Sequence, residues 1–253
     1  MILDKFKLEG KVAIVTGASA GLGEGIAAAL AEAGADVAGV ARRECEGARR
    51  KVESARHRFL NIQADLVSQE PIADIVEKTL AAFGRIDILV NNAGIIRRAD
   101  SVDYLERDWD DIMNVNLKSL FFLSQAVCRQ YLAQGSGGKI INIASMLSFQ
   151  GGIRVPAYTA SKSGVMGLTR LLACEWAKYG VNVNAIAPGY MATDNTEQLR
   201  NDPVRSKELL ARIPADRWGT PEDIGGAAVF LACEASSYMQ GYTIAVDGGW
   251  LAR

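Results

Sequence analysis

Along this chain, short runs of apolar residues alternate with longer stretches in which apolar residues recur every three or four positions. Val12–Val15 is the first such run, and Leu22, Ile26 and Leu30 then recur at helical spacing before Gly34, a residue type that commonly ends helices. This alternation is typical of βαβ units and a parallel sheet. Seven strands are predicted, at residues 12–15, 37–40, 59–64, 86–90, 139–144, 181–187 and 242–246.

Stretches of helical period predict helices at residues 72–83, 109–132 and 158–178. The predicted strands are apolar at almost every position, which is typical of strands buried on both faces of a sheet. No linker, charge block or internal repeat interrupts the series. We therefore predict an α/β protein in which residues 1–253 form a single-domain doubly wound Rossmann-type fold with a seven-stranded parallel sheet.

Residues 189–218 break this rhythm with a mixed polar sequence that follows the sixth predicted strand. Ligands in open α/β sheets bind beyond the carboxyl ends of the strands. We therefore expect this segment to form a lid or a substrate-binding region.

The composition narrows the functional classes. Of the 253 residues, 49% are hydrophobic and 23% charged, which excludes a disordered chain, a collagen and a small disulfide scaffold. With 28 Lys and Arg against 29 Asp and Glu, the net charge of −1 creates no field that would attract nucleic acid or an anionic membrane. No apolar run approaches the ~18 residues that a membrane span needs. We expect neither nucleic acid nor a membrane as a partner.

The cysteine and histidine usage is also informative. Cys45, Cys128, Cys174 and Cys233 lie far apart, which predicts neither a disulfide framework nor a metal site and fits a cytoplasmic protein. The one histidine, His57, stands between charged neighbours, as surface residues do. Acid–base chemistry near neutral pH must therefore use another residue type.

The turn after the first predicted strand is rich in glycine and leads directly into a helix. Glycines allow a tight turn and a close approach of the backbone to a ligand, and a helix N-terminus presents free N–H groups to an anion. A pyrophosphate suits such a turn, so a dinucleotide site is predicted. Its residues are Gly17, Ser19, Gly21, Leu22 and Gly23.

The end of the second predicted strand bears on the type of dinucleotide. An acidic residue there would bind a free ribose 2′-hydroxyl, whereas arginine would pair with a 2′-phosphate. The sequence has Arg42 and Arg43 and no carboxylate, which favours a 2′-phosphate unless both arginines are ordinary surface charges.

Tyr158 and Lys162 are four residues apart, so on a helix they share a face. A phenol has a pKa of about 10, and a nearby ammonium group lowers it by favouring the phenolate. In a chain without a usable histidine, this pair is the natural acid–base group.

The glycine turn, with three residues between its first two glycines, resembles that of the short-chain dehydrogenase/reductase family. Further motifs of that family follow in order, at Asn91–Gly94, Asn116, Ser145, Tyr158–Lys162, Pro188–Gly189 and Thr193. The resemblance implies an NAD(P)-dependent oxidoreductase. It also implies a homotetramer, with the helices around 109–132 and 158–178 at one interface.

The resemblance further implies roles for individual residues. Tyr158 would exchange a proton with the substrate oxygen, Lys162 would hold the nicotinamide ribose, Ser145 would bind the reacting carbonyl, and Asn116 would hold a water linked to Lys162. Other residues would contact the cofactor: Asp65 and Leu66 near adenine, Asn91, Asn92, Ala93 and Gly94 along the cleft, and Pro188, Gly189 and Thr193 toward the carboxamide.

Residues 94–98, 145–156, 187–193 and 246–253 most resemble sugar-acid dehydrogenases of this family. They imply a deoxy-keto sugar acid as substrate, of the 2-deoxy-D-gluconate or 2-dehydro-3-deoxy-D-gluconate type. They also imply NAD(H), so we expect NAD(H) to be favoured, with NADP(H) possible because of the two arginines. A buried carboxylate needs a cation. The candidates are Arg97, Arg98 and Arg154, with Arg154 favoured and Gln150 beside it for the sugar hydroxyls.

Two alternatives remain open. A 3-oxoacyl carrier-protein reductase of the same family would share the catalytic residues but should have a basic patch and a wide apolar cleft. A catalytically silent dinucleotide-binding protein would share only the fold.

Overall fold

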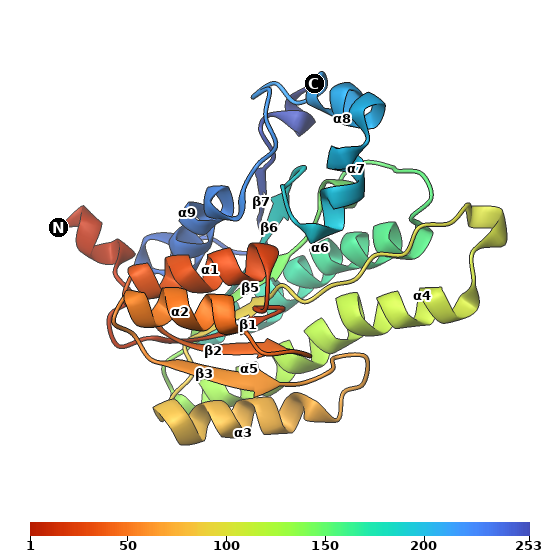
Figure 1. The fold of residues 1–253 in the computed structure, drawn as a ribbon. Coiled ribbons are helices and arrows are strands. Elements are labelled where there is room, and N and C mark those ends of the chain that lie inside the picture. The colour runs from red at the N-terminus through yellow and green to blue at the C-terminus, as the bar shows by residue number, and fades with distance from the viewer.

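The computed structural model describes residues 1–253 apart from the side chain of Asn195. Seven strands form one all-parallel sheet in the order β3-β2-β1-β4-β5-β6-β7 (Figure 1). The predicted doubly wound α/β fold is therefore confirmed. The strands are β1 Val12–Thr16, β2 Asp36–Ala41, β3 Phe59–Gln63, β4 Ile88–Asn91, β5 Gly138–Ile143, β6 Val181–Pro188 and β7 Thr243–Val246.

Helices cover both faces of the sheet (Figure 1). Successive side chains of a strand point to opposite faces. In β1, Ala13 and Val15 accordingly join one apolar core and Ile14 joins the other. The first core lies under α1 Gly21–Glu32, α2 Glu46–Ser54 and α9 Pro221–Ala232, and the second under α3 Pro71–Phe83, α5 Ser119–Gln134 and α6 Pro156–Trp176.

The helix predicted over 109–132 is interrupted. α4 Glu106–Met113 is followed by a π-helical turn, Asn114–Lys118, before α5 begins. A π turn adds a residue to the helical repeat and so rotates the side chains that follow. Here the turn contains the buried Asn116.

Four helices were not predicted: α2, α9, and the short α7 Glu197–Asn201 and α8 Pro203–Leu210. The start of α9 carries a signal that could have revealed it, because Thr220 and Asp223 form a capping box around Pro221 at the first helical turn. Among the described residues, no helix combines the length and the apolar character that a membrane span requires.

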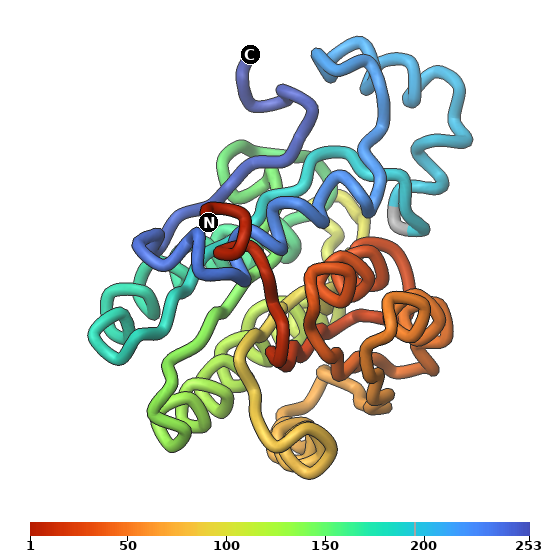
Figure 2. The backbone as a smooth tube through the Cα atoms, turned by 90° about the vertical axis from the view of Figure 1, so that its left-hand side faces the viewer, coloured from red at the N-terminus to blue at the C-terminus, as the bar shows by residue number. Residues whose placement is uncertain are grey.

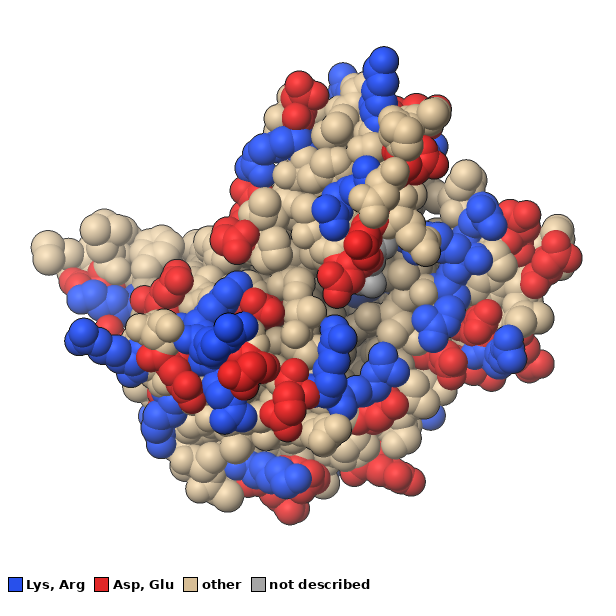
Figure 3. All heavy atoms as spheres, in the orientation of Figure 1, with Lys and Arg blue, Asp and Glu red and all other residues tan. Residues whose placement is uncertain are grey.

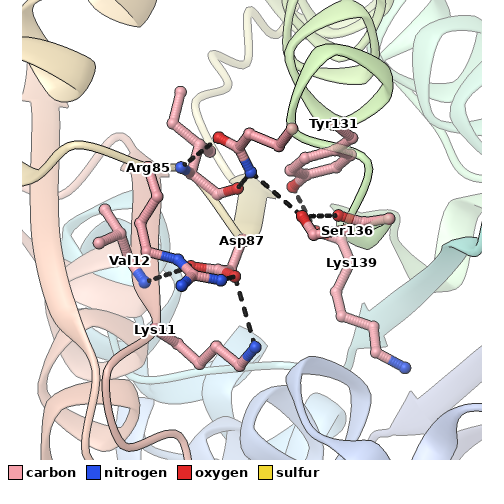
Figure 4. Close-up of polar contacts among 10 residues, drawn as sticks. Lys11, Val12, Arg85, Asp87, Tyr131, Ser136 and Lys139 are labelled. Atoms are coloured by element: carbon pink, nitrogen blue, oxygen red, sulfur yellow. Dashed lines mark hydrogen bonds and ion pairs between the residues drawn. The ribbon is translucent and has the colours of Figure 1, made fainter.

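A buried carboxylate joins strands at their amino ends (Figure 4). Asp87 accepts hydrogen bonds from the backbone N–H of Val12 at 3.0 Å and from Arg85 at 2.6 and 2.8 Å. Lys11 lies 3.4 Å from the same carboxylate. Hydrogen bonding to Asp87 raises the pKa of Arg85. This network ties β1 to β4 at the end of the sheet opposite their carboxyl termini.

Candidate functional site

A cavity of about 780 Å³ lies at the carboxyl ends of β1, β2, β4 and β5. In Figure 3 the molecular surface is hollowed on this face, with Lys, Arg, Asp and Glu side chains around it. The structure brings most of the predicted site residues together here. Those lining the cavity are Gly17, Ser19, Gly21, Leu22, Arg42, Asp65, Leu66, Asn92, Ala93, Gly94, Arg97, Tyr158, Lys162 and Thr193.

The glycine turn is held close to the end of β4 by Asn92, the residue that follows this strand. The Asn92 side chain donates from Nδ2 to the backbone oxygens of Thr16 and Gly17, at 2.9 and 3.3 Å. A Cβ atom on Gly17, whose φ is +69°, would lie 2.8 Å from this amide, and one on Gly23 would lie 2.2 Å from the Gly17 oxygen. Gly23 therefore serves the close packing of the turn and does not line the cavity.

The start of α1 can receive an anion. Its N-cap residue is Ala20, which offers no side-chain hydrogen bond to the first backbone N–H groups. Those N–H groups and the positive end of the helix dipole are thus available to a pyrophosphate. The turn at Gly17 has no room for a Cβ atom, and the first backbone N–H groups of α1 have no side-chain cap. Both features fit a bound dinucleotide.

Arg42 and Arg43 both line the cavity where β2 ends. Arg43 donates from Nε to the Ser19 hydroxyl at 3.4 Å, which places its guanidinium beside the glycine turn. Asp65 lines the next part of the wall, and its carboxylate accepts the backbone N–H of Val67 at 3.1 Å. This end of the cavity therefore combines two cations with one carboxylate.

Tyr158 and Lys162 lie in the first turns of α6 and both face the cavity. Lys162 is 4% exposed, and its Nζ donates to the Ile143 oxygen at 2.6 Å. Burial lowers the pKa of Lys162 to about 8. The ammonium lies 5.8 Å from the centre of the Tyr158 ring.

The expected lowering of the Tyr158 pKa is wrong for the chain alone. Burial raises this pKa, and a hydrogen bond with Ser145 and the positive charge of Arg98 oppose the rise only in part. Lys162 is not among the groups that act on this pKa, and its ammonium group donates to the carbonyl of Ile143.

Ser145 and Asn116 lie behind the cavity wall. Ser145 caps a short 3-10 turn, where its hydroxyl accepts the backbone N–H of Leu147 at 3.2 Å. Asn116 accepts from the backbone N–H of Ile95 at 2.8 Å and donates to the Ile95 oxygen at 3.0 Å. A Cβ on Gly94 would lie 3.3 Å from Asn116 Oδ1 and 3.7 Å from Lys162 Nζ, so these groups converge at Gly94.

Three residues predicted to contact the cofactor lie elsewhere. Asn91 is buried and donates to Ser124 and Asn142, both at 2.9 Å, because its side chain points into the second core. Pro188 and Gly189 do not line the cavity. A Cβ on Gly189 would lie 2.6 Å from the Asp247 backbone, which shows that this glycine allows β6 to pass the chain after β7.

The arginines predicted to bind the substrate carboxylate are placed differently from one another. Arg97 lines the cavity, and Arg98 acts electrostatically on Tyr158. Arg154, the favoured candidate, instead lies 3.1 Å from Asp100 and lines a separate cavity of about 580 Å³. Gln150 lines neither cavity. The preference for Arg154 stays a prediction, and in the folded chain its exposed guanidinium pairs with Asp100 outside the first cavity.

His57 lies away from the cavity, as expected. Its Nδ1 is 3.7 Å from Asp36, which begins β2 and therefore stands at the opposite end of that strand from Arg42. Sequence reasoning missed Asp111, Val115 and Ile143, which also line the cavity. Nothing in the sequence around these three residues distinguishes them from ordinary helix and strand positions. Within the described part of the chain, no group of His, Cys, Asp and Glu could hold a metal ion.

Comparisons with known proteins agree with this geometry. The family described as Enoyl-(Acyl carrier protein) reductase matches residues 17–251. A 2-dehydro-3-deoxy-D-gluconate 5-dehydrogenase from Dickeya dadantii is 64% identical over 253 residues, covering 100% of both chains.

Two solved structures are also similar. A protein from Agrobacterium tumefaciens, assigned as a 2-deoxy-D-gluconate 3-dehydrogenase and holding NADP, has a TM-score of 0.91 at 54% identity, covering 99% of this chain and 100% of that one. A gluconate 5-dehydrogenase from Burkholderia cenocepacia, in complex with NADP and tartrate, has a TM-score of 0.94 at 38% identity and covers 100% of both chains. The chain thus belongs to the short-chain dehydrogenase/reductase family and is a nicotinamide-dependent oxidoreductase.

Proposed function

We propose that this enzyme interconverts a hydroxyl and a ketone of a deoxy-keto sugar acid of the 2-dehydro-3-deoxy-D-gluconate type. The observation that carries the proposal is the grouping of Tyr158, Ser145 and Lys162 beside a cavity wall that also contains Arg97. The sugar-acid dehydrogenase with 64% identity over the whole chain supports this substrate class.

A nicotinamide cofactor bound in the cavity would supply the hydride acceptor or donor. In the reduction direction, the Tyr158 phenol gives its proton to the carbonyl oxygen as the carbon gains a hydride, and the product is an alcohol. Ser145 hydrogen-bonds the same oxygen and stabilises the charge that develops on it. Lys162, as a cation, would hold a ribose hydroxyl of the bound cofactor. Asn116 keeps Gly94 and Ile95 in place beside Lys162 and, in this proposal, holds a water linked to it.

For the cofactor, we propose NADP(H), a departure from the expected preference for NAD(H), which gains no support. Arg42 and Arg43 both face the cavity at the end of β2, where a 2′-phosphate would lie. Two similar structures hold NADP. A guanidinium pair there adds charge-assisted hydrogen bonds that NAD could not form.

Replacing Arg42 and Arg43 together by alanine tests the cofactor proposal. We expect kcat/KM for NADP to fall by about 10²–10⁴-fold, because the two charge-assisted hydrogen bonds contribute about 1.5–3 kcal/mol each. The value for NAD should change less than threefold. A parent enzyme that prefers NAD, or a double variant that loses both cofactors equally, would contradict the role of these arginines.

For the substrate carboxylate, we propose Arg97 and Arg98, which replace Arg154 as the candidates. Arg97 lines the cavity, and the charge of Arg98 reaches Tyr158, so both act at the reacting end of the site. An anion that leaves water for this site needs such a partner.

The rival function, reduction of acyl thioesters on a carrier protein, has less support. A carrier-protein reductase should present a basic patch to its acidic partner, whereas Figure 3 shows acidic and basic side chains interspersed around the hollow. Assays with both cofactors on 2-dehydro-3-deoxy-D-gluconate, a neutral diketone and a 3-oxoacyl thioester test the proposal. We expect the sugar acid to give the highest kcat/KM, and faster turnover of the thioester would refute it. No turnover of any ketone would favour the catalytically silent protein instead.

We also propose a homotetramer located in the cytoplasm. Exposed Trp109, Phe122, Leu132 and Leu171 on α4, α5 and α6 offer apolar area for subunit contacts. The four cysteines are unpaired, as is usual in a reducing compartment. Light scattering of the purified enzyme would give the subunit number.

A further inference from the structure

The segment 189–218, which we call the lid, rises from the end of β6 and contains α7 and α8. Its first part reaches the cavity, because Thr193 lines the wall. Its second part packs on the catalytic side, where Leu209 joins an apolar cluster with Met146, the residue after Ser145. The position of the lid therefore sets the space beside Ser145.

The last seven residues, Asp247–Arg253, form a tail that lies next to the lid at the top of the molecule (Figures 1 and 2). The Asp247 carboxylate accepts the backbone N–H groups of Gly249 and Leu251, both at 2.8 Å, and so fixes the bend of the tail. The backbone N–H of Ala215 in the lid donates to the Gly248 oxygen at 2.9 Å. Arg253 donates to the Ala211 oxygen. The tail is thus bonded to the second half of the lid.

Trp250 connects the tail to both halves of the lid. It is 3% exposed, and its ring meets the Tyr190 ring edge-on with centroids 4.8 Å apart. The Arg212 guanidinium lies over the Trp250 ring at 4.0 Å. Tyr190 in turn contacts the Trp218 ring at 5.8 Å. The indole therefore contacts the start of the lid at Tyr190 and its second half at Arg212, and Tyr190 links it to Trp218.

Contacts of its ring, and not a hydrogen bond, hold the Trp250 side chain against the lid. Trp250 Nε1 is buried without a hydrogen-bond partner among the described residues, so the donor contributes nothing to the contact and its burial costs free energy. The aromatic faces supply the attraction, through edge-on ring contacts and a cation above the ring. A phenylalanine at this position should therefore keep most of the effect, whereas an alanine should lose it.

We propose that the tail is a positioning element for the lid, and that Trp250 holds the lid against Met146 and so determines the affinity for the substrate but not for the cofactor. The residues proposed to hold the cofactor lie mainly in the glycine turn and at the end of β2, away from the tail, and Thr193 is the lid residue among them. The proposal rests on the proposed function only for the identity of the substrate, a sugar acid.

The test compares the full-length enzyme with Trp250→Ala and Trp250→Phe. Trypsin can report on the lid directly, because Arg200, Arg205 and Lys207 lie in it. For Trp250→Ala we expect about tenfold faster cleavage in the lid and about tenfold higher KM for 2-dehydro-3-deoxy-D-gluconate, with kcat within about threefold of the parent. NADPH binding, measured by its fluorescence, should stay within about twofold.

Trp250→Phe should restore slow cleavage and low KM. Tyr238→Ala is a matched control, because this aromatic side chain near the same end of the chain is fully exposed. It should behave like the parent. Circular dichroism shows whether each variant is folded. Parent-like cleavage and KM in folded Trp250→Ala would overturn the proposal, and so would equal losses of substrate and NADPH affinity. If the sugar acid is not turned over by the parent, the proposed function fails, while cleavage and NADPH binding still decide the role of the tail.

Discussion

At Lys162, burial and function make opposite demands on one side chain. Its removal from water lowers the pKa to about 8, whereas its proposed task next to Tyr158 requires a cation. In the folded chain its Nζ donates a hydrogen bond to the Ile143 oxygen. The ammonium group is therefore retained near neutral pH at a cost to stability.

This cost predicts a pH dependence of the free energy of unfolding. Between pH 8 and 10.5, Lys162 is protonated in the unfolded chain and largely neutral in the folded one. The unfolded state then binds more protons, so stability rises with pH in this window. Relative to Lys162→Met, the parent should gain about 2 kcal/mol between pH 8 and 9.5. Urea unfolding of both proteins at the two pH values measures the difference, and parallel curves would contradict the shift.

The role of Tyr158 can be tested by removing one oxygen. Tyr158→Phe keeps the ring in place but has no proton to exchange, so we expect activity to fall by about 10²–10⁴-fold. Binding of NADPH should remain, because the cavity keeps its glycine turn. The control is Ser163→Ala, an exposed position on α6. Ser148→Ala is unsuitable, because the Ser148 hydroxyl donates to the Lys162 backbone oxygen at 2.6 Å. Activity of Tyr158→Phe within a few-fold of the parent would exclude Tyr158 as the acid–base group.

On the scale of single elements, one glycine in α1 and one in α9 can be compared, because they differ in the space that a Cβ atom would have. A Cβ on Gly23 in α1 would lie 2.2 Å from the Gly17 oxygen, whereas one on Gly226 in α9 would meet nothing within 4 Å. Gly23→Ala should push the glycine turn out of place and weaken NADPH binding by more than about tenfold. Gly226→Ala should leave binding unchanged and stabilise the protein by up to about 1 kcal/mol, the helix preference of alanine over glycine. Titration and thermal unfolding check both, and equal NADPH affinity in the two variants would be the contrary result.

The strands and the glycine turn could be predicted from sequence because their signals are local. Val12–Val15 is buried on both faces, so its apolar run is continuous, and the turn needs glycine where a Cβ would clash. The π turn at Asn114–Lys118 could not be predicted, because its residues fit an ordinary helix and the extra residue follows from tertiary packing.

The directions of the side chains in the site could not be predicted from the sequence either. Arg154 follows the catalytic loop in sequence, as a substrate ligand would, but an ion pair with Asp100 from a different segment turns it aside. The Tyr158 pKa was misjudged for a similar reason, because helical spacing places Lys162 on the right face without fixing where its Nζ bonds. Spacing predicts neighbours along one element, and partners from other elements determine which contacts form.

On the scale of the whole molecule, the two ends of the sheet have separate tasks. Asp87 joins β1 and β4 at their amino ends, while the cavity lies at the carboxyl ends. Replacing Asp87 by alanine leaves the Val12 N–H and the Arg85 guanidinium without this partner, and we expect a loss of about 2–4 kcal/mol in the free energy of unfolding. The kcat of the folded fraction should not change.

Asp74→Ala provides the comparison for this prediction. Asp74 pairs with Lys78 at 2.8 Å, but both side chains are about half exposed, so its loss should cost less than about 1 kcal/mol. Chemical unfolding and steady-state kinetics on the two variants separate the effects. A smaller loss for Asp87→Ala than for Asp74→Ala would refute the structural role of Asp87.

The strand order has a consequence for the lifetime of the protein. β1 and β4 are neighbours although two strands separate them in sequence, so the cavity wall comes partly from residues before β4, such as Gly17 and Arg42, and partly from later ones, such as Tyr158 and Thr193. A dinucleotide in this cavity bridges two halves of the chain and binds only when both are folded and docked. At a hundred times its Kd such a ligand adds about 2.7 kcal/mol to stability. The amount of this enzyme that survives heating or proteolysis would then follow the supply of its cofactor.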